Sequence, residues 1–332
     1  MTLDELIGAR LAIGIPGPEV TEEIVETFRV TGAQQLILFS WNVVSVEQCS
    51  RLLRQLEALL ERKLLVLVDH EGGRIIRFHE GVTRFPDALT VGRTQRPEEV
   101  ERQGATEAEE LKRLGVRVNL APCADVLMPD ADPVIGDRSY GADSDRVAEY
   151  TVARIRGLQS HGVAACAKHF PGLGAVQRDP HQTLPTIALD WAAMRATHLP
   201  PFEAAIRAGV AMIMSSHVCY PALGDPPDLP ATFSPRLMRT LLREELGFDG
   251  VIVTDDLEMG ALCAFGTMGE LCARATEAGH DLLLICSGLS AAREAAKMLR
   301  RAYASGRLSQ VELERSVERI LTLRRRFLYN VS

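Results

Sequence analysis

Residues 163–181, VAACAKHFPGLGAVQRDPH, carry the pattern around which the rest of the chain is organised. The apolar run at their start predicts a short buried strand. A loop with two glycines and two prolines follows Lys168 and His169, and it contains Asp179 two positions before His181. Loops held by a rigid strand often carry catalytic groups, and a carboxylate beside an imidazole permits proton transfer near neutral pH. Asp179 and His181 are therefore candidate catalytic residues, although such a pair is also common in solvated loops.

Seven further apolar runs recur along the chain, separated by longer amphipathic stretches. They span residues 11–15, 35–40, 64–69, 116–121, 211–216, 251–255 and 282–286, and residues 163–168 are the eighth run. This alternation predicts an α/β fold, a single (β/α)8 TIM-type barrel, with one catalytic domain over residues 1–332. A doubly wound open sheet is the alternative. It would need a Gly-x-Gly-x-x-Gly turn after an early strand, and residues 13–18, IGIPGP, do not match that motif.

Helix signals lie between the runs. An apolar stripe in residues 46–60 predicts an amphipathic helix, while Pro97 and the pair Ser234-Pro235 predict helix starts. A last helix over residues 309–327 is expected to pack outside the barrel. Glycines precede five of the runs, where a helix must stop and the chain must turn back: Gly115, Gly162, Gly209, Gly250 and Gly279.

Composition narrows the class of function. The chain has 332 residues, of which 46% are hydrophobic, and its net charge of -7 argues against a general nucleic-acid binder. Neither a secretory signal nor an apolar run of membrane-spanning length is apparent. Seven cysteines without Cys-x-x-Cys spacing fit a reducing compartment. We expect a cytoplasmic monomer or weak oligomer that acts on a small molecule and binds neither nucleic acid nor membranes.

Polar side chains follow the predicted strands at the end where barrel enzymes carry their chemistry. In chain order they are Asp69, His70, Glu71, Arg77, Asp125, Arg138, Lys168, His169, His217, Asp255 and Asp256. Each has a structural alternative: Asp125 can cap a loop, and Glu71 can brace the turn at Gly72 and Gly73. Random solvated residues would not favour one end of the strands, so the set predicts a single site.

Among these residues, Asp255 indicates the type of reaction most directly. A carboxylate at the end of an apolar strand needs cationic or hydrogen-bonding neighbours to remain ionised, and Arg77, Arg138 and Lys168 are expected at the same mouth. An ionised carboxylate can form a covalent glycosyl intermediate, as in retaining glycosidases. A metal hydrolase is the competing hypothesis. The cations would oppose a metal, and no tight ligand spacing such as His-Glu-x-x-His occurs, so no metal is expected.

Five motifs, in order along the chain, resemble those of family-three glycoside hydrolases. They are DHEGGR at 69–74, IGDRS at 135–139, KHFPG at 168–172, the Asp-x-His of residues 179–181, and GVIVTD at 250–255 after LLREE at 241–245. The last is similar to the family signature, and the others resemble its β-N-acetylhexosaminidase branch. The resemblance implies a TIM-barrel exo-β-N-acetylglucosaminidase without a cofactor, similar to cytoplasmic bacterial enzymes that process anhydro-muropeptides in cell-wall recycling.

The resemblance also implies residue roles. Asp255 would attack the anomeric carbon, and His181, oriented by Asp179, would be the general acid/base. The sugar would be held by a set of charged and polar residues: Asp69, Arg77, Arg138, Lys168 and His169.

Two positions depart from the branch, which usually has His in place of Leu173 and Ser in place of Pro180. They bear on loop closure, leaving-group preference and rate. Within the family, a β-glucosidase and a phosphorylase of β-N-acetylglucosaminides are the alternatives, since a histidine acid/base would not repel phosphate. A catalytically dead sugar-binding barrel is the alternative from another class.

Overall fold

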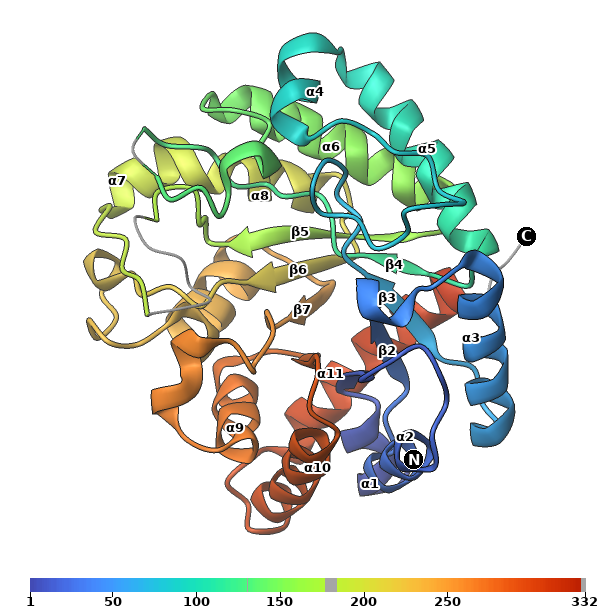
Figure 1. Cartoon of the computed structure of the whole chain (residues 1–332). Helices are drawn as coiled ribbons and strands as arrows, with labels where there is room; N and C mark the ends of the chain where they lie inside the picture. Colours follow the sequence, from blue (N-terminus) through green and yellow to red (C-terminus); the bar gives the residue numbers. More distant parts are fainter. Residues whose placement is uncertain (130, 177–183, 330–332) are drawn as a thin grey trace.

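The computed structural model describes residues 1–129, 131–176 and 184–329 (Figure 1). Eight parallel strands lie in the order β7-β6-β5-β4-β3-β2-β1-β8, and a parallel bridge between Val253 and Leu282 joins the two ends of that order. The strands are β1 (Leu11–Gly14), β2 (Gln35–Leu38), β3 (Leu65–Val68), β4 (Val118–Asn119), β5 (Ala164–Phe170), β6 (Met212–Ser215), β7 (Val251–Val253) and β8 (Leu283–Ile285). The sheet thus curls into the predicted (β/α)8 barrel.

Helices surround the strands. They are α1 (Leu3–Gly8), α2 (Glu22–Thr31), α3 (Val46–Leu60), α4 (Ala88–Thr94), α5 (Pro97–Arg113), α6 (Ser144–Ser160), α7 (Trp191–Ala193), α8 (Leu199–Arg207), α9 (Met268–Ala278), α10 (Leu289–Ala304) and α11 (Gln310–Arg324). The predicted helix over 46–60 is confirmed as α3, and α5 begins at Pro97 as predicted. The hydroxyl of Ser234 accepts a hydrogen bond from the amide of Leu237 at 3.0 Å, which confirms the helix start before the π-helical segment η6 (Arg236–Glu245).

The glycines before the strands do not all act alike. Gly279 ends α9 with a φ of 115°, a left-handed conformation that favours glycine. Gly250 was expected to do the same before β7, but the left-handed residue there is Gly247, with a φ of 67°. Gly250 is instead required by close packing, since a Cβ at this position would lie 2.6 Å from the carbonyl oxygen of Ala211.

The barrel interior is filled by a layer of apolar side chains. Alternate strand residues point inward and pack on one another: Ala12, Ile37, Leu65, Leu67, Val118, Leu120, Ala164, Cys166, Met212, Met214, Val251, Val253 and Leu284. Their neighbours, such as Ile13, Leu36 and Val66, face the helices. This alternation follows from the period of two along a strand. Because the interior is packed, a ligand has room only at the ends of the strands.

The C-terminal helix does not pack outside the barrel, so that expectation was wrong. Ile320 and Leu323 of α11, with Phe327 of the π-helical segment η8 (Arg325–Tyr329), join the inner apolar layer. Arg324 donates hydrogen bonds to the carbonyl groups of Gln34 and Lys63, which precede β2 and β3. The apolar stripe of α11 therefore closes the amino end of the barrel, behind the strands in Figure 1.

The seven cysteines are free thiols, and all except Cys263 are buried. Across the three described ranges, no helix combines the length and the apolar character needed to cross a membrane. One-domain organisation over residues 1–332 stays a prediction.

Candidate active site

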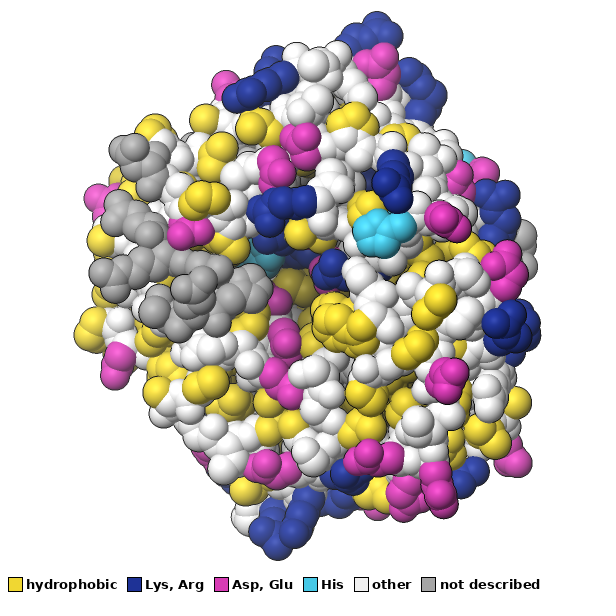
Figure 2. Space-filling model, viewed as in Figure 1, with side chains coloured by type: hydrophobic (Ala, Val, Ile, Leu, Met, Phe, Trp, Pro, Cys, Tyr) yellow, Lys and Arg dark blue, Asp and Glu magenta, His cyan; other side chains and the backbone are white. Residues whose placement is uncertain are grey.

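A cavity of about 410 Å³ opens at the carboxyl ends of the strands. Its apolar floor is the end of the inner layer, at Ile37, Leu120, Met214 and Leu284. Six of the residues proposed from the sequence line it together: Asp69, Arg77, Arg138, Lys168, His169 and Asp255. The other two, Asp179 and His181, lie outside the described residues. Figure 2 shows a hollow in this face of the molecule, with basic, acidic and histidine side chains around it.

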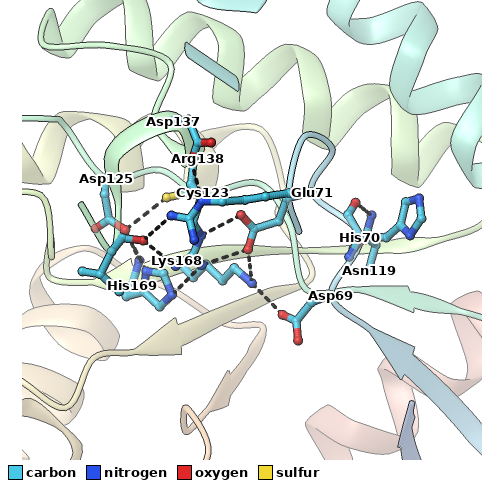
Figure 3. A network of polar contacts seen from close by, with 12 residues as sticks. Asp69, His70, Glu71, Asn119, Cys123, Asp125, Asp137, Arg138, Lys168 and His169 are labelled. Atoms are coloured by element: carbon cyan, nitrogen blue, oxygen red, sulfur yellow. Dashed lines mark hydrogen bonds and ion pairs between the residues drawn. The ribbon is translucent and has the colours of Figure 1, made fainter. Parts of the chain in front are cut away.

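Glu71 lies between two cations at one wall of the cavity (Figure 3). Its Oε1 atom is 2.7 Å from Nζ of Lys168, and Arg138 donates two hydrogen bonds of 2.9 Å to the same carboxylate. Burial alone would raise the pKa of Glu71, but Arg138 and Lys168 hold it far below its usual value. The neighbouring turn is closed by amides of Glu71 and Gly72 donating to the Ile75 carbonyl. The Glu71 side chain therefore orients cations and does not brace the turn.

Asp69 binds the other side of Lys168. Its Oδ1 atom is 2.7 Å from Nζ, and its Oδ2 atom is 3.1 Å from Nη2 of Arg77. Burial opposes ionisation of Asp69, but Lys168 and Arg77 bring its pKa below the usual value. Burial would likewise lower the pKa of Lys168, yet Asp69 and Glu71 raise it well above normal. These charges are fixed at neutral pH, so this wall can bind and orient hydroxyl groups but cannot exchange protons.

His169 is held by a buried carboxylate. Its Nδ1 atom lies 2.7 Å from Oδ2 of Asp125, and its Nε2 atom lies 3.3 Å from Nη2 of Arg138. Asp125 also accepts hydrogen bonds from the amides of His169, at 3.2 Å, and Leu173, at 2.5 Å. Asp125 thus caps the loop after β5, which is the structural role that the sequence suggested for it. It also orients His169, a residue of the cavity. The Leu173 side chain is buried in the apolar core, so only the backbone amide of Leu173 takes part in this network.

Cys123 completes the group around Asp125. Its thiol donates to Oδ2 of Asp125 at 3.2 Å, and possible ligand atoms of Cys123, Asp125 and His169 lie within 4.8 Å of one another. Burial and the Asp125 charge raise the pKa of the thiol well above normal, so the thiol remains a hydrogen-bond donor to Asp125. Cys123 and His169 each bond to the same oxygen of Asp125, and Arg138 adds positive charge beside them. The set fits a hydrogen-bond network and not a metal site.

Asp255 follows β7 and lines the cavity. Its Oδ1 atom accepts a hydrogen bond from the amide of Asp256 at 2.8 Å. Burial would raise the pKa of Asp255, but the neighbouring His169 and His217 rings, together with that amide and Lys168, bring the pKa below its usual value. Asp255 is therefore an ionised carboxylate that faces a partly apolar cavity, which is the state a nucleophile requires.

The neighbouring carboxyl group differs. Asp256 lines the same cavity, and its Oδ1 atom accepts from the amides of Glu258, at 3.0 Å, and Cys286, at 3.3 Å. Burial is the main cause that raises the pKa of Asp256 to about 6. The sequence placed Asp256 among the polar residues at the strand ends but gave this second titratable acid no individual role.

His70 lies apart from the paired charges, and its backbone exchanges two hydrogen bonds with the Asn119 side chain (Figure 3). It is buried, and its Nδ1 atom accepts a hydrogen bond from the Arg77 amide at 3.2 Å. Burial and the nearby Arg154 charge lower the pKa of His70 to about 3, so the ring is neutral. His70 therefore supports the loop that carries Arg77 and takes no part in proton transfer.

Comparison with known proteins places these observations in a family. The glycosyl hydrolase family 3 N-terminal domain matches residues 2–323. A β-hexosaminidase of Idiomarina loihiensis is 36% identical over 283 residues, which cover 84% of each chain. The structure of a glycoside hydrolase family 3 β-N-acetylglucosaminidase from Paenibacillus superposes with a TM-score of 0.96 at 35% identity, over all of this chain and 64% of that longer chain. A β-N-acetylhexosaminidase from Beutenbergia cavernae gives a TM-score of 0.89 at 28% identity, over 97% of this chain and 98% of the other.

Proposed function

The chain belongs to glycosyl hydrolase family 3, and from this premise we propose that it is a retaining exo-β-N-acetylglucosaminidase. Family membership and relatives named β-hexosaminidase establish a glycoside hydrolase. The proposal adds the stereochemical course, the residues that act, and the substrate.

One observation carries the proposal: an ionised Asp255 shares a cavity with a wall of fixed, paired charges. Carboxylates and cations held by one another offer donors and acceptors in set directions, as the hydroxyl groups of a sugar require. We assign sugar binding to Asp69, Arg77, Arg138, Lys168 and His169, and we add Glu71 as the residue that positions two of these cations.

The reaction has two displacements. In the first, a carboxylate oxygen of Asp255 attacks the anomeric carbon, and the bond from that carbon to the leaving oxygen breaks. The leaving oxygen takes a proton from His181, which Asp179 orients. In the second, water gives a proton to His181 and attacks the same carbon, which releases Asp255. Two inversions return the β configuration.

A separate acid/base is needed because the binding wall cannot supply a proton. Asp69 and Glu71 are held ionised and Lys168 is held protonated, so none of the three changes charge near neutral pH. An imidazole with an ordinary pKa of about 6.5 can act as acid and then as base. His181, which resembles the branch's acid/base, is the residue we assign to this step.

The natural substrate is proposed from the relatives. Their names specify a β-hexosaminidase or a β-N-acetylglucosaminidase, and terminal β-linked N-acetylglucosamine is the sugar that both descriptions share. We propose peptidoglycan fragments of the anhydro-muropeptide type, acted on in a bacterial cytoplasm. Seven free thiols support a reducing compartment.

Hydrolysis of an aryl N-acetyl-β-glucosaminide tests the proposal, with the aryl β-glucoside in parallel and with or without phosphate. We expect turnover of the N-acetyl substrate, little of the glucoside, and the β anomer as first product by proton NMR. A glycosyl phosphate product would identify a phosphorylase, preference for the glucoside a β-glucosidase, and an α product an inverting enzyme. Sugar binding without any turnover would indicate a dead barrel.

A further inference from the structure

A second cavity lies at the opposite end of the barrel from Asp255. It has a volume of about 50 Å³, and it is lined by four arginines and two hydroxyl residues: Arg10, Arg239, Arg243, Arg319, Thr276 and Ser316. Arg10 precedes β1 directly, and Arg243 donates a hydrogen bond to the carbonyl group of Gly250, just before β7. We call this space the arginine cavity. Its position at the amino ends of the strands separates it from the catalytic machinery.

Positive charge is in excess around the arginine cavity. Asp281 is fully buried and pairs with both Arg243 and Arg319, while Glu312 pairs with Arg239 at 3.2 Å. Four guanidinium groups therefore line a space in which only two carboxylates, Asp281 and Glu312, pair with them directly. Burial is the main cause that lowers the pKa of Arg243; the neighbouring Arg319 adds to this shift, while Asp281 and Asp249 oppose it.

Arg10 is the cation without an anion. Only 1% of its surface is exposed, and its guanidinium donates to the carbonyl groups of His280 and Asp281 and to the hydroxyl of Tyr303. Among the described residues, no carboxylate lies within 4.0 Å of it. Carbonyl dipoles solvate a guanidinium but leave its charge in place, and buried charges are normally paired.

One hydrogen-bond donor without a partner, the hydroxyl of Thr276, lines the same space. The Thr276 side chain lies in a residue that is only 8% exposed, and its hydroxyl has no partner among the described residues. A buried hydroxyl without a partner is uncommon in folded proteins and calls for an explanation. Arg319, whose side chain is 29% exposed, uses one nitrogen to bind Asp281 and makes the arginine cavity accessible from solvent.

We propose that the arginine cavity binds a phosphate group, either as inorganic phosphate or as the end of a phosphate monoester. The excess of guanidinium groups over the carboxylates that pair with them favours a dianion such as a phosphate monoester, which carries a charge of about -1.5 to -2 at neutral pH. Guanidinium forks and hydroxyl groups are the donors that bind such oxygens. A volume of 50 Å³ has room for a few water-sized groups, which suits a phosphate but excludes a sugar or a nucleotide base.

Calorimetric titration of the whole protein with inorganic phosphate tests the proposal, at constant ionic strength with chloride as the control anion. Saturable binding of phosphate to the wild type is expected. Arg319→Gln and the nearly isosteric Thr276→Val should each weaken it, the former by about tenfold or more because a charge-assisted contact is lost. Arg293→Gln is the matched control, since Arg293 forms an exposed ion pair with Glu23 elsewhere on the surface, and it should bind phosphate like the wild type.

Glycerol phosphate distinguishes the two sources. Tighter binding of this monoester than of inorganic phosphate would identify a phosphorylated metabolite as the ligand, and weaker binding would identify the free ion. Absence of saturable binding by the wild type would overturn the proposal. So would binding that both variants retain and that N-acetylglucosamine displaces, because the phosphate would then lie beside Asp255. Hydrolysis of the aryl substrate should be unchanged in Arg319→Gln, which shows that the variant is folded.

Discussion

Nδ1 of His169 lies 2.7 Å from Oδ2 of Asp125, a carboxylate with no exposed surface. This contact links the wall of the catalytic cavity to the loop after β5, since the other oxygen of Asp125 accepts the amide of Leu173. A single buried carboxylate thus sets both the orientation of a sugar-binding ring and the start of the loop that leads to His181.

Asp125→Asn tests this link. The substitution keeps the shape of the side chain but removes the charge that holds His169, a hydrogen bond worth about 1.5–3 kcal/mol. We expect kcat/KM for the aryl N-acetyl-β-glucosaminide to fall by about 10- to 100-fold, with an unchanged near-ultraviolet circular dichroism spectrum. Cys123→Ala is the control, because it removes only the weak thiol donor, and it should cost less than about threefold. Equal losses in the two variants would contradict a specific role for the Asp125 charge.

Glu71→Gln should destabilise the protein, because Lys168 and Arg138 lose a shared buried partner. Breaking a buried ion pair costs about 3–5 kcal/mol. The pKa of Glu71 is lowered on folding, so its contribution is complete above the unfolded-state pKa of about 4.3 and is lost as the pH falls through the lower folded-state value. Urea unfolding of both proteins should show a constant difference from pH 7 to pH 5.5 that shrinks below about pH 4.3. The exposed control Glu26→Gln should show no such difference.

Asp256→Asn should change stability in the opposite direction. Burial raises the pKa of Asp256 to about 6, so the folded protein disfavours the charged form. That penalty is absent below the unfolded-state pKa of about 3.9, grows as the pH rises, and is complete above pH 6. The free energy of unfolding of the variant, relative to the wild type, should therefore increase between pH 4 and pH 8. A relative stability that falls over this range would show that folding lowers the pKa of Asp256 and does not raise it.

His181→Ala should distinguish the acid/base from other titratable groups. Loss of a general acid slows departure of a poor leaving group far more than departure of an activated phenol. We expect a loss of about 10²- to 10⁴-fold in kcat on N,N′-diacetylchitobiose and a much smaller loss in the first step for a dinitrophenyl glycoside. Asp256→Asn is the comparison, since burial raises the pKa of this carboxyl group in the cavity to about 6. If Asp256→Asn gave the leaving-group dependence and His181→Ala did not, the two assignments would have to be exchanged.

Much of the fold was predictable because barrel strands have a strong local signature. The inward residues Leu65, Leu67 and Val118 are apolar, and the helix-facing residues Val66 and Val68 are apolar too, so the strands appear as short continuous runs. The position of α11 was not predictable in this way. An apolar stripe on a helix shows that one face is buried but does not show whether it meets the outside or the amino end of the barrel.

The candidate site was predictable as a set and less so as individual contacts. Strand ends placed Asp69, Lys168 and Asp255 at one mouth, and the cavity confirms that they meet. The pairing of Glu71 with Arg138 joins residues 67 positions apart, and Asp125 reaches His169 across 44 positions. No local spacing encodes these contacts, because they depend on the register of neighbouring strands. The sequence could indicate only that a carboxylate at the end of an apolar strand would be buried and would therefore need cations close to it.

Covalent trapping at Asp255 tests the central claim most directly. The wild type is incubated with a 5-fluoro-N-acetyl-β-glucosaminyl fluoride, whose slow second step lets the glycosyl intermediate accumulate, and is then analysed by intact-protein and peptide mass spectrometry. We predict one added sugar per chain, attached to the peptide that contains Asp255, and none in Asp255→Ala. An enzyme that hydrolyses the aryl N-acetyl-β-glucosaminide but gives no adduct, or gives one on another residue, would contradict the assignment of Asp255 as the nucleophile.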